Sequence, residues 1–109
     1  MKWFTIESET DLMQIDEKSE QNPVVIFKHS TRCSISAMAK SRLERDAAPE
    51  GVDFYLLDLI KFRSLSNLIA EKYAVQHESP QVLLIKNKAC IYDESHNGIR
   101  MEELFEQVA

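Results

Sequence analysis

Residues 23–36 read PVVIFKHSTRCSIS, and this stretch decides the fold. Its apolar run, Val24–Phe27, has no polar interruption, which is typical of a strand covered on both faces in the middle of a parallel or mixed sheet. A polar turn at residues 30–32 follows, and a helical pattern begins at Cys33. The sequence therefore predicts a buried strand that leads through a short turn directly into a helix, with a cysteine at the junction.

Outward from this stretch, strand patterns alternate with helix patterns. We expect strands at residues 3–6, 23–29, 52–59, 80–85 and 89–92. We expect helices between Ser8 and Pro23, at about 33–48 and 63–74, and after Gly98 through Val108. In the second helix, the expected buried side is formed by Ile35, Met38, Ala39 and Leu43. The order β-α-β-α-β-α-β-β-α, with its late hairpin, predicts an α/β domain with a mixed central sheet of about five strands flanked by helices on both faces.

The composition is that of a folded domain. The chain has 109 residues, of which 44% are hydrophobic and 28% charged, which predicts a single domain at residues 1–109. No apolar run approaches the ~20 residues of a membrane helix, and a net charge of −5 argues against nucleic acid as the main partner. No signal-peptide pattern occurs at the start, so we expect a cytoplasmic protein with free thiols.

Cys33 is the candidate for chemistry because it stands where a strand leads into a helix. The amides and the dipole at a helix start favour an anion, so a thiol there should ionise more readily than a free cysteine. Arg32 adds a positive charge next to it, and Ser36, one helical turn later, is expected to donate a hydrogen bond to the thiolate. The alternative is that Cys33 is a small buried apolar residue, which is the commonest role of an isolated cysteine.

A second thiol partner for Cys33 is not expected within the chain. Ser36 stands where dithiol oxidoreductases have a resolving cysteine, and serine cannot form a disulfide. Cys90 is expected near the far end of the hairpin, about 20 Å from Cys33 at ~3.3 Å per strand residue. Because a disulfide needs Cα atoms within ~7 Å, we interpret Cys90 as a strand-packing residue.

Two segments carry a family resemblance: Ser30–Ser36, with its lone cysteine, and His77–Gln81, in which Ser-Pro opens a strand. They resemble the thioredoxin superfamily and, within it, the monothiol bacilliredoxins of the YtxJ type. The resemblance extends over nearly the whole chain and implies a thioredoxin-like fold. The sequence departs from the usual motif at Ser34, where relatives commonly have proline.

Carried over position by position, the resemblance makes Cys33 the catalytic nucleophile and Ser36 the residue that replaces a resolving thiol. Pro80 would be a cis-proline that faces the sulfur, and Ser79 would offer its backbone to the bound thiol. The predicted substrate-binding set is Thr31, Arg32, His77, Ser79 and Pro80. Arg32, Lys28 and His77 are candidates for holding the carboxylates of bacillithiol, and His29 is interpreted as a strand-end residue.

The resemblance implies a monothiol thiol–disulfide oxidoreductase that removes bacillithiol, a low-molecular-weight thiol of many Gram-positive bacteria, from S-bacillithiolated proteins. Cys33 would carry the bacillithiol as a mixed disulfide until an external thiol resolves it. The expected partners are client proteins and the low-molecular-weight thiol, without nucleic acid or membrane, and we expect a monomer. Bacillithiol would be a co-substrate, no bound cofactor is expected, and the histidines and cysteines have no zinc-site spacing.

Other functions stay open at this point. An iron–sulfur carrier of the monothiol glutaredoxin type would use the same cysteine, although Cys33–Ser36 does not match the Cys-Gly-Phe-Ser motif of those proteins. A redox-silent binding module would keep the fold without the chemistry. A thiol peroxidase is a further possibility, but no second residue is arranged for peroxide.

Overall fold

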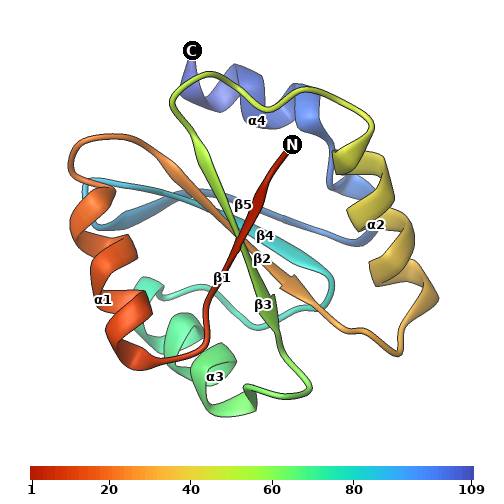
Figure 1. Ribbon diagram of the computed structural model, residues 1–109, viewed down its shortest axis with the longest axis horizontal. Helices are drawn as coiled ribbons and strands as arrows, with labels where there is room; N and C mark the ends of the chain where they lie inside the picture. The colour runs from red at the N-terminus through yellow and green to blue at the C-terminus, as the bar shows by residue number, and fades with distance from the viewer.

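The computed structural model describes residues 1–109 and contains a five-stranded mixed sheet with helices on both faces (Figure 1). The strands are β1 (Trp3–Thr5), β2 (Val24–His29), β3 (Asp53–Asp58), β4 (Gln81–Lys86) and β5 (Ala89–Ser95). The helices are α1 (Glu9–Lys18), α2 (Ser34–Glu44), α3 (Arg63–Tyr73), α4 (Met101–Val108) and the short 3-10 helix η1 (His96–Gly98). This order confirms the predicted α/β architecture. None of the helices has the length and apolar character needed to cross a bilayer.

β2 is the central strand of the sheet, whose order is β1-β3-β2-β4-β5. It runs parallel to β3, with His29 opposite Asp58 at its end, and antiparallel to β4. β4 and β5 form the predicted hairpin, and its turn residues Asn87 and Lys88 have φ values of 52° and 64°. Two consecutive residues with positive φ are what a tight two-residue hairpin requires, because their twist matches that of the strands.

Each face of the sheet has its own apolar cluster, and the residues of β2 alternate between the two. Ile26 packs in the cluster that includes residues of α1 and α3, whereas Phe27 packs in the cluster that includes residues of α2 and α4. Figure 1 shows these helix pairs on opposite sides of the sheet. Because side chains along a strand alternate between faces, the next two residues, Lys28 and His29, also point to opposite faces.

α2 differs from the prediction in its length and in the side that it buries. It ends at Glu44 rather than near residue 48. Its buried residues are spaced three and four apart: Ser36, Ala39 and Leu43. Ile35 and Met38, which we expected in the core, are 48% and 63% exposed, so that prediction is wrong. Each of them precedes a buried residue by one position, which turns its side chain about 100° away from the buried side.

Candidate active site

The junction between β2 and α2 places Cys33 at the amino-terminal end of the helix. Cys33 is the N-cap residue, with an extended backbone (φ −109°, ψ 121°). Its N–H donates to the Ser30 carbonyl at 3.2 Å, and its own carbonyl accepts from the N–H of Ala37 at 3.1 Å. Its thiol is free and partly exposed. Because the first amides of a helix have no partner within the helix and the dipole is positive there, this position stabilises an anion.

Ser36 lies one helical turn after Cys33 and is fully buried. Its hydroxyl oxygen accepts from the N–H of Ser30 at 3.0 Å and lies 2.6 Å from Nδ1 of His29. We expected this hydroxyl to donate to the Cys33 thiolate, but in the structure its hydrogen bonds are made with the end of β2. The physical reason is that Ser36 is on the buried side of α2, which faces the sheet.

His29 is the last residue of β2, as predicted, and is only 8% exposed. Burial is the main reason why the pKa of its imidazole lies below the ordinary value. The positive charge of Lys40 acts in the same direction, whereas Asp58 and Glu44 act against it. His29 is therefore neutral at pH 7. Sequence reasoning missed its pairing with Ser36, although the alternation of β2 and the spacing of α2 place both residues on one face.

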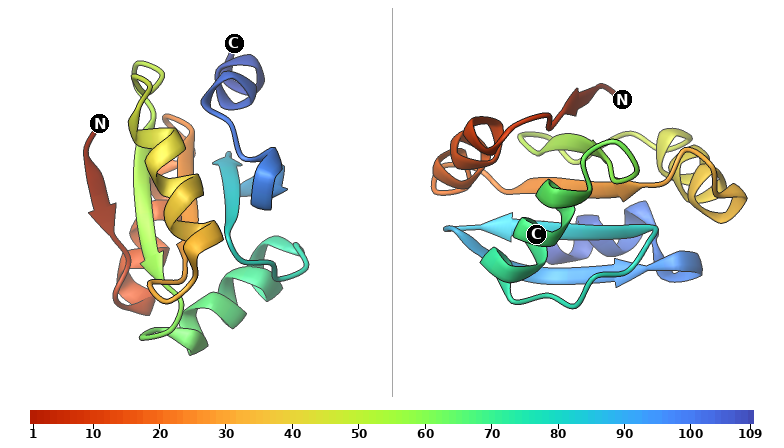
Figure 2. Two further views of the ribbon diagram at one scale, coloured as in Figure 1. Left: turned by 90° about the vertical axis from the view of Figure 1, so that its right-hand side faces the viewer. Right: turned by 90° about the horizontal axis from the view of Figure 1, so that it is seen from below.

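The loop that contains Pro80 reaches the same end of the sheet. The Ser79–Pro80 peptide bond is cis, and β4 begins at the next residue, Gln81. Gln81 pairs with Lys28, so Pro80 lies beside the carboxyl end of β2, from which the chain continues to Cys33. Figure 2 (left) shows the turn before α2 and the loop before β4 at the same end of the sheet. The fold thus brings together the two motifs that carry the resemblance.

A buried lysine fixes the loop before Pro80. Lys28 has no exposed surface, and its ammonium donates to the Ser66 carbonyl at 3.1 Å and lies 3.2 Å from Nδ1 of His77. Burial lowers the pKa of Lys28 to about 8. Burial first, and then the charges of Lys28 and Arg63, lower the pKa of His77. A fully buried ammonium cannot contact a substrate, so the prediction that Lys28 holds carboxylates of bacillithiol is wrong.

The other predicted substrate-binding residues surround this end of the sheet. Thr31 and Arg32 are exposed in the turn before Cys33, and Ser79 is partly exposed. His77 is partly buried, and one of its ring nitrogens faces Lys28. The structure therefore brings the predicted set to one region, while the role of each residue in substrate binding stays a prediction.

Cys90 lies at the opposite end of the sheet from Cys33. It pairs with Ile85 of β4, and Ile85 pairs with Val24, the first residue of β2. The length of β2, six residues at ~3.3 Å each, thus separates the two cysteines. The Cys90 thiol donates to the Tyr92 carbonyl at 3.3 Å, and burial raises its pKa. Its predicted packing role is consistent with these contacts.

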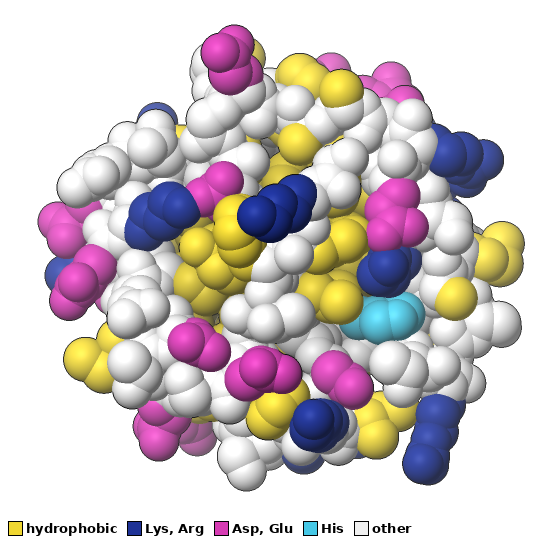
Figure 3. Space-filling model, in the orientation of Figure 1, with side chains coloured by type: hydrophobic (Ala, Val, Ile, Leu, Met, Phe, Trp, Pro, Cys, Tyr) yellow, Lys and Arg dark blue, Asp and Glu magenta, His cyan; other side chains and the backbone are white.

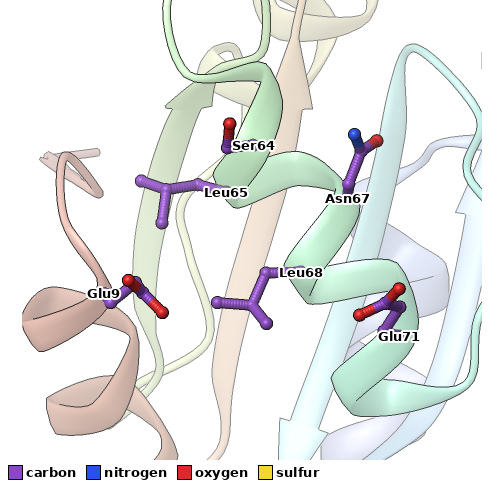
Figure 4. A pocket seen from close by; sticks show the side chains of 6 residues that line it. All are labelled: Glu9, Ser64, Leu65, Asn67, Leu68 and Glu71. Atoms are coloured by element: carbon purple, nitrogen blue, oxygen red, sulfur yellow. The ribbon is translucent and has the colours of Figure 1, made fainter.

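Cys33 lines none of the three surface hollows of the molecule. One of about 390 Å³ lies between α1 and α3 (Figure 4) and is lined by Glu9, Ser64, Leu65, Asn67, Leu68 and Glu71. The other two border the outer side of α2 and the space between α4 and the segment after α2. On the face shown in Figure 3, acidic and basic side chains are interspersed rather than gathered by sign. Cys33 is partly exposed and lines none of these hollows.

Comparison with solved structures identifies the fold as thioredoxin-like. A protein provisionally described as an oxidoreductase with a thioredoxin fold is 32% identical, with a TM-score of 0.79 over 95% of this chain and 91% of that chain. The thioredoxin of Malassezia sympodialis has a TM-score of 0.73 at 20% identity and covers 98% of this chain and 88% of its own. Thioredoxin F from spinach chloroplast has a TM-score of 0.71 at 16% identity over 98% and 90%. The last two show the fold alone.

The sequence profile described as monothiol bacilliredoxin BrxC matches residues 4–104. The match runs from β1 into α4 and includes both Ser30–Ser36 and His77–Gln81. It confirms the resemblance derived from those two motifs. In general terms, the activity is that of a thioredoxin-like thiol–disulfide oxidoreductase. The chain belongs to the monothiol bacilliredoxin family.

Proposed function

We propose that this protein removes bacillithiol from S-bacillithiolated proteins by monothiol exchange at Cys33. The observation that carries the proposal is the arrangement at the carboxyl end of β2. One partly exposed thiol lies at the start of α2, the loop with the cis-proline Pro80 reaches the same end, and Ser36 occupies the position of a second thiol. Such an arrangement supports attack on a disulfide of another molecule without closure of an internal one.

The proposed reaction has two exchange steps. In the first, the Cys33 thiolate attacks the bacillithiol sulfur of the mixed disulfide, and the client cysteine leaves as a thiolate that takes a proton from water. In the second, the thiolate of another bacillithiol attacks the same bacillithiol sulfur, and Cys33 leaves as a thiolate. One disulfide is consumed and one, bacillithiol disulfide, is formed, so the protein itself is neither oxidised nor reduced overall.

The separation of the two cysteines supports resolution by an external thiol. Cys33 follows the carboxyl end of β2, whereas Cys90 lies beside the strand that pairs with its amino end. A disulfide needs the two Cα atoms within ~7 Å. Cys33 and Cys90 could form one only if the two ends of the sheet moved together. Both thiols are free in the structure, which suits a reducing compartment, and we propose the cytoplasm as the place of this activity.

The partly exposed position of Cys33, outside the surface hollows, suits a protein substrate. Thr31 and Arg32 are exposed beside it, and we propose that the Arg32 guanidinium pairs with a carboxylate of bacillithiol. The partly exposed Ser79 would bind the substrate through its backbone, with Pro80 on the other side of the sulfur. His77 would border this site through its exposed edge.

Intact mass spectrometry after mixing the reduced protein with bacillithiol disulfide tests the proposal. We expect one bacillithiol on Cys33, none on Cys33→Ala, and an unchanged adduct on the matched control Cys90→Ala. Addition of free bacillithiol should then restore the unmodified mass. With an S-bacillithiolated client as substrate, the same variants should show the same pattern of release.

Three results would contradict the proposal, each in a different way. An internal disulfide between Cys33 and Cys90 would exclude the one-thiol mechanism. Absence of any adduct on a folded protein would favour a redox-silent binding module. A stable visible chromophore that requires Cys33, formed by anaerobic reconstitution with iron and sulfide, would favour a cluster carrier.

A further inference from the structure

The outer side of α2 carries two exposed apolar side chains close to the thiol. Ile35 and Met38 are 48% and 63% exposed, and their spacing of three residues places them on the same side of the helix. Figure 2 (left) shows no other helix or strand over the outer side of α2. The core therefore leaves these two side chains free, and the apolar surface that they form begins two residues after Cys33.

Two arginines continue this side of the helix. Arg42 follows Met38 by four residues and Arg45 follows Arg42 by three, so they extend along one line of the helix surface. All three residues border a hollow of about 440 Å³. At ~1.5 Å per residue, the cationic end begins about 14 Å from Cys33 along the helix axis. These side chains form a surface that we call the α2 stripe: Ile35, Met38, Arg42 and Arg45.

The positive charges of the α2 stripe have no acidic partner within the chain. Neither Arg42 nor Arg45 forms an ion pair. The Arg42 guanidinium donates to two backbone carbonyls, which fix its position and leave its charge uncompensated. The nearby Lys40 and Glu44 pair with each other at 2.7 Å, and Asp46 lines the hollow toward α4. A chain with a net charge of −5 thus presents uncompensated cations on the helix that begins at its thiol.

These two properties of the α2 stripe define the chemistry of the partner that fits it. Carboxylates pair well with guanidinium groups, and charge complementarity speeds encounter and disfavours wrong partners. Apolar side chains of the partner would pack against Ile35 and Met38, and the flexible methionine adapts to partners of different shape. Because the stripe begins beside Cys33, a protein bound along it brings its own cysteine next to this thiol.

We infer that the α2 stripe binds the client protein and selects clients with an apolar side chain beside the modified cysteine and acidic side chains farther from it. An extended client segment advances ~3.3 Å per residue, so its carboxylates reach Arg42 and Arg45 from about the fourth and fifth positions away from the cysteine. The inference rests on the proposed function, since it names the class of mixed disulfide that reaches Cys33. It leaves the exchange reaction itself as written above.

Two synthetic peptides, each with one S-bacillithiolated cysteine, test the inference on the full chain. Both have leucine at the second position on either side of the cysteine. They differ at the fourth and fifth positions on either side, which are glutamate in one peptide and lysine in the other. Mass spectrometry follows the rate of bacillithiol transfer to Cys33. We expect a several-fold higher rate constant for the glutamate peptide, against the net charge of the chain, and a smaller preference at high salt.

Variants of the α2 stripe separate its charge from its apolar surface. Arg45→Glu should abolish the preference for the glutamate peptide, and Arg45→Lys should keep it. The control Lys86→Glu makes the same change of charge at the opposite end of the sheet and should also keep the preference. Met38→Ser should slow transfer from both peptides, whereas Met13→Ser, at a 61% exposed position on α1, should slow neither. Urea denaturation shows that each variant is folded.

Equal rates for the two peptides in the wild type, or a preference that survives in folded Arg45→Glu, would overturn the inference. A wild-type dimer that Arg45→Glu dissociates, seen by analytical ultracentrifugation, would assign the stripe to a second copy of the chain and overturn it as well. If bacillithiol disulfide itself gives no adduct, the proposed function fails. In that case NMR titration of Cys33→Ala with the same two peptides still decides which of them the stripe binds.

Discussion

Lys28 and His29 are consecutive residues of β2, and both are buried titratable side chains, yet they act on opposite faces of the sheet. Lys28 reaches the Ser66 carbonyl on α3 and the imidazole of His77 in the loop before Pro80. His29 reaches the Ser36 hydroxyl on α2, the helix that begins after Cys33. The end of β2 thus contacts the loop before Pro80 from one face of the sheet and α2 from the other.

Lys28 and His29 differ in the kind of group that each of them contacts. The main partner of Lys28 is a backbone carbonyl, which has no proton to redirect, so we expect the loss of Lys28 to act through stability and loop position. His29 contacts the buried Ser36 hydroxyl, which also accepts from the N–H of Ser30, so we expect the loss of His29 to act on the turn before Cys33. In both residues burial lowers the pKa, which makes stability sensitive to pH.

The largest expected effect is the loss of stability in Lys28→Ala. The substitution leaves a cavity and removes the donor to the buried Ser66 carbonyl and the partner of the partly buried His77 ring, so the free energy of unfolding should fall by about 2–4 kcal/mol. Urea denaturation at pH 7 measures it. The control Lys86→Ala, at the exposed end of β4, should stay within about 0.5 kcal/mol of the wild type. Equal losses in the two variants would show that Lys28 has no structural role.

A second expected effect is a rise in the free energy of unfolding, by as much as about 3 kcal/mol, as the pH increases through the alkaline range. The pKa of Lys28 is about 8 in the folded protein and 10.5 ordinarily. Between these values the unfolded chain binds a proton that the folded protein does not, so stability rises with pH. Measured against Lys28→Met, which keeps the volume without the charge, the wild type should gain stability from pH 8 to 10.5. A difference that is constant with pH would contradict the buried ammonium.

A smaller change in stability is expected at acidic pH, where histidines on both faces of the sheet can be compared. His29 and His77 have lowered pKa values, so the unfolded chain takes up their protons first as the pH falls below about 6.5. Wild-type stability should therefore decrease with acidification, by at most about 1.4 kcal/mol per pH unit from each residue. His29→Asn and His77→Asn should each flatten this decrease in denaturation series. If only one variant does so, only that face contains a buried neutral imidazole.

The smallest expected loss of stability is that of a substitution at Arg42, near the carboxyl end of α2. The Arg42 guanidinium donates to the carbonyls of Ile99 at 2.9 Å and His96 at 3.1 Å, which joins α2 to the segment around η1. Arg42→Lys cannot make both bonds in the same geometry and should cost about 1 kcal/mol in thermal or urea denaturation. Arg45→Lys, at an exposed position after α2, is the matched control and should show no change.

Local patterns in the sequence were sufficient to predict the order of elements and the position of the thiol. The apolar run of β2, the polar turn and the spacing of α2 are contained in one stretch of the chain, so Cys33 at the start of a helix follows from them. The hairpin turn at Asn87 and Lys88 is local as well. The motif with Pro80, through its family resemblance, predicted the second half of the site.

Only the tertiary structure decided which partners the buried polar groups have. Lys28 meets Ser66 and His77, which are 38 and 49 residues away in the sequence, and no local pattern encodes such pairs. The tertiary structure also determines the rotation of α2 about its axis, which buries Ser36 and exposes Met38. The side of a helix that faces the sheet is the side that packs best against it, which depends on the whole core. A buried polar group is stable only beside a hydrogen-bond partner, and the packed fold brings that partner to it.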